Sequence, residues 1–175
     1  MDTLQTERLT LRELSEQDAP LMLAVLTDPD FVRNVGDRGV HTEDDARRYI
    51  VDGPIAMYRQ YDFGMYRVEL KDGTAVGLCG LVKRDGLEDV DIGFAFLPRF
   101  RGQGYALEAA QAVMAYGRGT IGLKRIVAIA RPDNLPSVQL LEKLGMQAER
   151  HIKLPKDDTE LVLMGWDADS AKDEQ

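Results

Sequence analysis

The stretch that decides the fold lies near the middle of the chain and reads Leu97-Pro98-Arg99-Phe100-Arg101-Gly102-Gln103-Gly104-Tyr105-Ala106. It follows an apolar stretch typical of a strand, residues 91–96, and precedes an alanine-rich stretch typical of a helix, residues 105–118. Glycines let the backbone approach a ligand, and the first N–H groups of a helix are free to bind anion oxygens. The pattern therefore indicates a loop that holds a pyrophosphate, with Arg99 and Arg101 adding positive charge. A surface turn into a helix is the alternative interpretation.

Two other phosphate-binding motifs fit this loop less well. A nucleotide-hydrolase loop ends in Gly-Lys-(Ser/Thr), whereas Gly104 is followed by Tyr105. A dinucleotide fingerprint needs a small residue where Leu107 stands and an acid about twenty residues on, where the chain has Lys124 and Arg125.

The overall composition sets further limits. The 175 residues are 44% hydrophobic and 30% charged, which suits one domain with a sizeable core. The net charge of −8 argues against a nucleic-acid binder and is compatible with a cationic substrate. No apolar run approaches the roughly 18 residues of a membrane span. Because the N-terminal residues do not resemble a signal peptide and Cys79 is the only cysteine, we expect a cytoplasmic protein without disulfides or a membrane partner.

The order of predicted elements indicates the fold class. Seven strands are predicted, at residues 6–14, 63–70, 75–82, 90–96, 125–130, 146–154 and 160–166. Helices are expected from Ser15, from Thr42 with an interruption at Gly53-Pro54, from Tyr105 and from Asn134, while residues 31–41 are expected to be irregular. This order predicts an α+β fold, a mixed sheet with helices on both faces. We expect one domain over residues 1–166 and a disordered acidic tail over residues 167–175.

Three motifs together resemble the GNAT acetyltransferases. The Arg-x-x-Gly-x-Gly spacing of the loop is similar to their acyl-CoA signature. The run from Asn134 to Met146, with Asn-x-x-Ser followed by Leu-Glu-Lys-Leu-Gly-Met, and the opening Thr6-Glu7-Arg8-Leu9 are similar to the RimJ/RimL-type branch. The resemblance covers residues 6–165 and implies the GNAT fold, a mostly antiparallel sheet of about seven strands.

The resemblance also implies a site for acetyl-CoA as co-substrate. Phe94, Ala95 and Phe96 would lie where two strands splay apart, and their backbone would pair with pantetheine amides. The loop residues Arg99, Arg101, Gly102, Gln103, Gly104, Tyr105 and Ala106 would hold the pyrophosphate. Asn134 would bind the pantetheine arm, although its side chain could instead cap the following helix.

The candidate catalytic groups come from the helix after Asn134 and from the residues around the start of the strand at 90–96. Many GNAT enzymes use a Tyr acid where this chain has Leu141, so Ser137 is the substitute, as a proton relay to the leaving sulfur, unless it only serves the first helical turn. Asp91 is the first candidate for the base. Glu88 and Asp89 lie on the same approach, and strand alternation predicts that Asp89 and Asp91 share a face. His151 is a further option. The two histidines and Cys79 do not have the spacing of a metal site, so we expect no metal.

The sequence therefore predicts acetyl transfer from acetyl-CoA to a primary amine, on a small molecule or a peptide N-terminus, by direct attack in a ternary complex. The alternative is a GNAT fold kept as a CoA-binding or protein-interaction module. Subunits of the family often pair through a sheet edge, so a homodimer is compatible with the resemblance.

Overall fold

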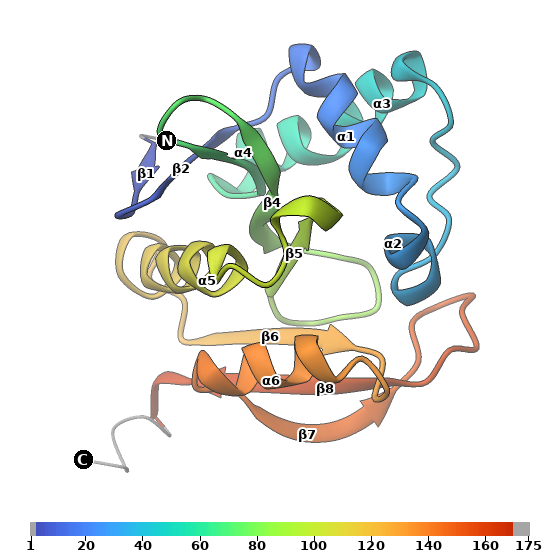
Figure 1. Ribbon diagram of the computed structural model, residues 1–175. Helices are drawn as coiled ribbons and strands as arrows, with labels where there is room; N and C mark the ends of the chain where they lie inside the picture. Colours follow the sequence, from blue (N-terminus) through green and yellow to red (C-terminus); the bar gives the residue numbers. More distant parts are fainter. Residues whose placement is uncertain (1–2, 170–175) are drawn as a thin grey trace.

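The computed structural model describes residues 3–169. Its centre is a mixed sheet with helices on both faces (Figure 1). Its strands are β1 Leu4–Gln5, β2 Leu9–Glu13, β3 Met65–Leu70, β4 Ala75–Val82, β5 Asp91–Phe96, β6 Arg125–Ala130, β7 Gln147–Ile152 and β8 Leu161–Asp167. Its α-helices are α1 Ala19–Leu26, α2 Pro29–Asn34, α3 Glu43–Ile50, α4 Ala56–Tyr61, α5 Tyr105–Tyr116 and α6 Leu135–Lys143. Short 3-10 turns (η1 Glu16–Asp18, η3 Pro98–Phe100) and π-helical turns (η2 Val51–Ile55, η4 Gly117–Ile121) lie between them.

The strands run in the order β1-β2-β3-β4-β5-β6-β8-β7. Every neighbouring pair is antiparallel except β5 and β6, which are parallel. Adjacent residues of β4 show the two layers that cover the sheet: Cys79 packs in the cluster that contains α5 and α6, and Leu78 packs with α1 and α3. The predicted α+β mixed sheet is thus confirmed, with β1 as one strand more than the seven predicted.

Two segments differ from the sequence-based prediction. Residues 29–34 form helix α2 where an irregular segment was predicted from residue 31, because Asp28 accepts a hydrogen bond from the Phe31 N–H (3.2 Å) and Pro29 occupies the first turn. Asp167, assigned to the tail, belongs to β8 and pairs with Arg125 at 3.0 Å. The tail from residue 170 lies outside the described residues.

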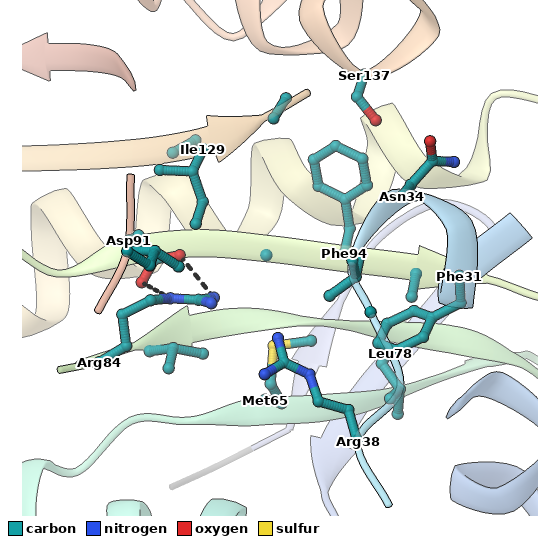
Figure 2. A pocket seen from close by; sticks show the side chains of 18 of the residues that line it. Phe31, Asn34, Arg38, Met65, Leu78, Arg84, Asp91, Phe94, Ile129 and Ser137 are labelled. Carbon is teal, nitrogen blue, oxygen red and sulfur yellow. Dashed lines mark hydrogen bonds and ion pairs between the residues drawn. The ribbon is translucent and has the colours of Figure 1, made fainter. Parts of the chain in front are cut away.

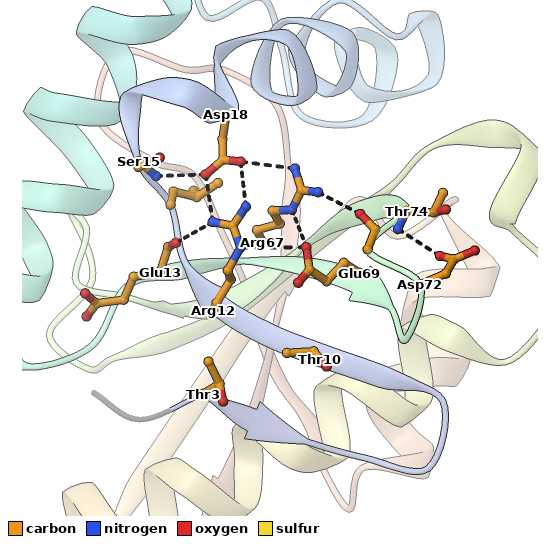
Figure 3. Close-up of polar contacts among 12 residues, drawn as sticks. Thr3, Thr10, Arg12, Glu13, Ser15, Asp18, Arg67, Glu69, Asp72 and Thr74 are labelled. Atoms are coloured by element: carbon orange, nitrogen blue, oxygen red, sulfur yellow. Dashed lines mark hydrogen bonds and ion pairs between the residues drawn. The ribbon is translucent and has the colours of Figure 1, made fainter.

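A buried carboxylate ties the first strands to the start of α1 (Figure 3). Asp18, 3% exposed, accepts two hydrogen bonds from Arg12 (3.0 and 3.1 Å), one from Arg67 (3.0 Å) and one from the Ser15 N–H (2.8 Å). Burial alone would raise the pKa of Asp18, but the hydrogen bonds from Arg12 and the Ser15 N–H prevail, so the pKa lies below its usual value. This network holds β2 and β3 in register beneath α1.

No helix within residues 3–169 is both long enough and apolar enough to cross a bilayer. In the same range, no three His, Cys, Asp or Glu side chains gather in a way that could hold a metal ion.

Candidate active site

The sheet opens between its two parallel strands. β5 and β6 are in register only at Asp91 and Val127. Beyond that point β5 stays with β4 as far as Phe96, while β6 stays with β8 as far as Ala130. The two strands therefore diverge, and their facing edges have no strand partner there within the described chain.

The opening exposes backbone groups of β5. The Leu97 N–H donates to the Val76 carbonyl at 3.0 Å, which sets the alternation of the antiparallel β4–β5 pair. By that alternation the N–H and C=O of Phe94 point away from β4, toward the opening. Such groups can pair with an extended amide ligand as an added strand does.

A cavity of about 680 Å³ lies at this opening, and we call it the central cavity (Figure 2). Residues of α1–α3, β4–β6, α6 and the loop after β7 line it. Of the site residues predicted from the sequence, the lining includes Asp91, Phe94, Ala95, Asn134 and Ser137. Phe96 instead lies in the hydrophobic core with 7% of its surface exposed.

Two polar residues at the start of α6 line the central cavity, and neither side chain makes a hydrogen bond to another residue of the described range. Asn134 occupies the N-cap position, but its side chain makes no capping hydrogen bond. Ser137, in the first turn, makes no side-chain hydrogen bond within residues 3–169, and Figure 2 shows its hydroxyl pointing into the cavity. Leu141, one turn further on, is buried and lines the same cavity. The polar atoms that α6 offers a ligand here are therefore those of Asn134 and Ser137.

Asp91 is the buried carboxylate of the central cavity. It is 1% exposed and receives two hydrogen bonds from Arg84, Nε to Oδ1 at 3.1 Å and Nη2 to Oδ2 at 3.0 Å. Burial raises the pKa of Asp91 above its usual value, and the charge of Arg84 opposes that rise. A carboxyl group with a raised pKa beside a ligand cavity is suited to proton transfer.

The other acid–base candidates lie elsewhere. Glu88 and Asp89 line a separate cavity of about 340 Å³, and Asp89 accepts a hydrogen bond from Arg125 at 3.0 Å. The expectation that Asp89 and Asp91 share a face is wrong, because residues 88–89 form a bend before β5 begins. His151 pairs with Glu160 on the surface and is absent from the lining of the central cavity.

The glycine-rich loop has the backbone geometry that its sequence predicts. Gly102 and Gly104 have φ of +74° and +84°, a region that strongly favours glycine. Gly104 is the N-cap of α5, so the N–H groups of the first turn have no intrahelical acceptor. Within the described residues, the N–H groups of 102–104 also have no acceptor. The loop and helix start therefore present a row of free donors.

The two arginines of the loop have different surroundings. Arg101 is engaged by the protein: it contacts Asp28 and Asp30 at 2.6 Å each and donates to the Phe96 carbonyl at 2.9 Å. Arg99 lies over the ring of Phe100, 4.6 Å from its centroid, and pairs with no carboxylate in residues 3–169. Arg99 is thus the loop arginine whose charge is available to an anion, whereas Arg101 holds the loop against α2.

A contact that the sequence did not predict supports the loop from behind. Arg8 donates from Nη1 to the Gln103 carbonyl (2.9 Å) and from Nε to Glu108 (2.7 Å), and it lies over the ring of Tyr105. Thr6 donates to the same Glu108 carboxylate at 2.6 Å. The opening motif Thr6-Glu7-Arg8 is the sequence signal for this contact. The residues next to the motif do not indicate that it binds residues about 100 positions away.

Comparisons with known proteins identify the family. A model of the acetyltransferase (GNAT) domain matches residues 8–147. The chain belongs to the GNAT acetyltransferase family. The prediction of an acetyltransferase of this family is likewise confirmed.

Relatives of this acetyltransferase include two uncharacterised N-acetyltransferases. YnaD of Bacillus subtilis strain 168 is 31% identical over 156 residues, which is 87% of this chain and 88% of YnaD. The p20 protein of Bacillus licheniformis is 31% identical over 151 residues, 85% of this chain and 84% of p20.

Solved structures share the fold of the acetyltransferase. A GNAT-family acetyltransferase from Bacillus anthracis superposes with a TM-score of 0.79 at 28% identity, covering 96% of this chain and 99% of that one. A RimL ribosomal-protein alpha-N-acetyltransferase in complex with coenzyme A has a TM-score of 0.82 at 20% identity, covering 97% and 99% of the two chains. The similarity to the RimL structure shows that the two chains share a fold.

Proposed function

We propose that the acetyltransferase moves the acetyl group of acetyl-CoA to a primary amine, on a small molecule or a peptide N-terminus, by direct attack in a ternary complex. The observation that carries the proposal is the opening between β5 and β6 at the central cavity, where the backbone of Phe94 has no partner strand on the β6 side among the described residues. The fold shared with a RimL structure that contains coenzyme A supports the same ligand.

The free groups around the opening fit the parts of acetyl-CoA. Free N–H groups at the glycine-rich loop and the start of α5 suit a pyrophosphate, and Arg99 adds charge beside them. The unpaired Phe94 backbone and the Asn134 side chain suit the amides of the pantetheine arm. When bound, acetyl-CoA supplies an acetyl group that is activated as a thioester.

Three groups of the chain would each serve one step of the reaction. An amine reaches the enzyme mostly as ammonium, with a pKa near 10.4 for a lysine-like amine and about 7.7–8.0 for an α-amine. Asp91 would accept the ammonium proton, directly or through a water. The Phe94 N–H would donate to the oxyanion that forms as the amine attacks the carbonyl. Ser137 would relay to the sulfur the proton that the attacking nitrogen must still lose, as the C–S bond breaks.

Calorimetric titration with acetyl-CoA tests the first half of the proposal, with adenosine diphosphate as a probe of the nucleotide and pyrophosphate contacts without the pantetheine arm. We expect micromolar binding by the parent and none by Gly104→Glu, because a carboxylate would enter the anion site at a residue with φ of +84°. Gly119→Glu is the matched control, since a Cβ there meets nothing within 4 Å and no positive φ is involved. Unchanged affinity in folded Gly104→Glu would remove the loop from the site.

Release of free thiol in the presence of a panel of amines tests the second half. Binding without turnover on any amine would favour the CoA-binding module, and a folded protein that does not bind acetyl-CoA at all would favour a protein-interaction module.

A further inference from the structure

Four arginine side chains line the central cavity, and three of them are neutralised by a neighbouring carboxylate. These pairs are Arg33 with Asp30 at 2.6 Å, Arg84 with Asp91 at 3.0 Å and Arg131 with Asp133 at 3.0 Å. Arg38 is the exception: it makes no hydrogen bond or ion pair with any residue in the described range 3–169. Among the described residues, Arg38 is therefore the one arginine of the lining without a direct carboxylate partner.

The position of Arg38 directs that charge into the cavity. Arg38 belongs to the segment between α2 and α3, and Figure 2 shows its guanidinium extending toward Met65 of β3. The lining of the cavity also includes apolar and aromatic side chains, such as Phe31, Tyr49 and Leu78. A charge beside apolar walls interacts more strongly with a bound ion than a fully hydrated charge does.

The other carboxylate in the lining does not fill this role. Asp157, in the loop after β7, accepts a hydrogen bond from the Thr159 N–H at 2.9 Å and forms no ion pair with Arg38. The pKa of Asp157 is lowered chiefly by hydrogen bonds from Thr159, with a smaller contribution from the charge of Arg38. Asp157 thus interacts with the charge of Arg38 without a direct contact, and the N–H donors of Arg38 remain available to a ligand.

We infer that the acceptor amine carries a carboxylate, and that Arg38 binds this carboxylate while the amine lies toward Asp91. The apolar lining selects a molecule with an apolar body, so the substrate class is an amino acid or similar amino-carboxylate with an apolar side chain. A polyamine would place a second cation beside Arg38 and be disfavoured. This inference rests on the proposed amine acetylation.

The test measures kcat/KM by thiol release for matched acceptors, leucine against leucinamide and phenylalanine against phenylalaninamide. Each pair differs in the carboxylate, and comparing parent with variant cancels the different reactivity of the two amines. We expect Arg38→Gln to lower kcat/KM for the carboxylates by about tenfold or more, the effect of losing a hydrogen bond between charged groups, while the amides change little. Arg38→Glu should lower it further for the carboxylates.

Arg33→Gln is the matched control, because Arg33 lines the same cavity but already pairs with Asp30. It should keep the preference of the parent for carboxylates. Equal acetyl-CoA affinity in all variants, measured by calorimetry, shows that each is folded.

The outcomes separate the inference from the proposed function. If amides or polyamines are acetylated as well as the carboxylates, or if Arg38→Gln affects both acceptors of a pair equally, the inference is overturned while amine acetylation stands. If no amine of any kind is acetylated, the proposed function fails and the inference fails with it.

Discussion

Arg8 and Gln103 are joined by a hydrogen bond of 2.9 Å, from the guanidinium Nη1 to the backbone carbonyl. The bond connects the segment before β2 to the middle of the glycine-rich loop. Because the carbonyl of Gln103 is held on the side of Arg8, the N–H groups of the loop are left for a ligand. A Cβ added at Gly104 would lie 3.2 Å from Nη2 of Arg8, which shows how closely the side chain backs the loop.

We expect Arg8→Ala to weaken acetyl-CoA binding by about three- to tenfold, the effect of losing one or two hydrogen bonds that order the loop. Turnover at saturating acetyl-CoA should change little, because Arg8 is not in the lining of the central cavity, which contains Asp91 and Ser137. Calorimetry for affinity and steady-state kinetics for the KM and kcat values make the distinction. Arg47→Ala, a surface arginine of α3 paired with Glu43 at 3.6 Å, should leave both unchanged. A loss of kcat at unchanged affinity would contradict the positioning role.

Ser137→Ala tests the proposed relay of a proton to the leaving sulfur. A full general acid contributes at least roughly a hundredfold, and a hydroxyl relay contributes less, so we expect kcat to fall by about tenfold. Acetyl-CoA affinity should remain close to that of the parent, since the loop and Asn134 are intact. Gln139→Ala, an exposed position on the same helix, serves as the control. Parental kinetics in Ser137→Ala would assign the serine to helix structure alone.

Asp91→Asn tests the base through its pH dependence. Asp91 must be ionised to accept a proton, so kcat/KM should rise with pH through its pKa, which burial places above the usual aspartate value. Asparagine cannot titrate, so the variant should be slow and should lack this acidic limb. A pH–rate profile from about pH 5 to 9 measures it, with the acetyl-CoA affinity checked at each end. Persistence of the limb in the variant would assign it to another group.

Asp18→Asn tests the buried network of Figure 3. Removing one charge leaves Arg12 and Arg67 without their shared partner, and we expect a loss of about 3 kcal/mol in the free energy of unfolding at pH 7. The pKa of Asp18 is lowered in the fold, so its stabilisation is complete above the unfolded pKa of about 3.9 and disappears as pH falls through the lower folded value. The parent and the variant should therefore converge in acid.

Denaturant titrations at pH 7 and in acid measure the Asp18 effect. Asp44→Asn on the exposed start of α3 should cost far less, because exposed ion pairs contribute little. A constant difference between parent and Asp18→Asn across the whole pH range would show that the side chain acts by packing rather than by charge.

Local signals in the sequence predict much of the fold. The bounds of β4 and β6 match the predicted ones, and the capping box at Thr42 starts α3 as its residues indicate. The spacing of Gly102 and Gly104 predicts the loop because positive φ favours glycine whatever surrounds it. Each of these signals acts between residues a few positions apart, so the sequence carries it directly.

The partners of the charged residues depend on packing. Arg101 was expected at the pyrophosphate but is held by Asp28, more than seventy positions away, and Arg8 contacts Gln103, from which it is separated by 95 positions in the sequence. Asp91 faces the central cavity while Asp89, two residues earlier, turns to Arg125, because a bend precedes β5. Arginines and carboxylates are abundant in this chain, and their pairing is set by which surfaces the buried cores bring together. That arrangement, in which Arg38 has no direct carboxylate partner among residues 3–169, exists only in the folded chain.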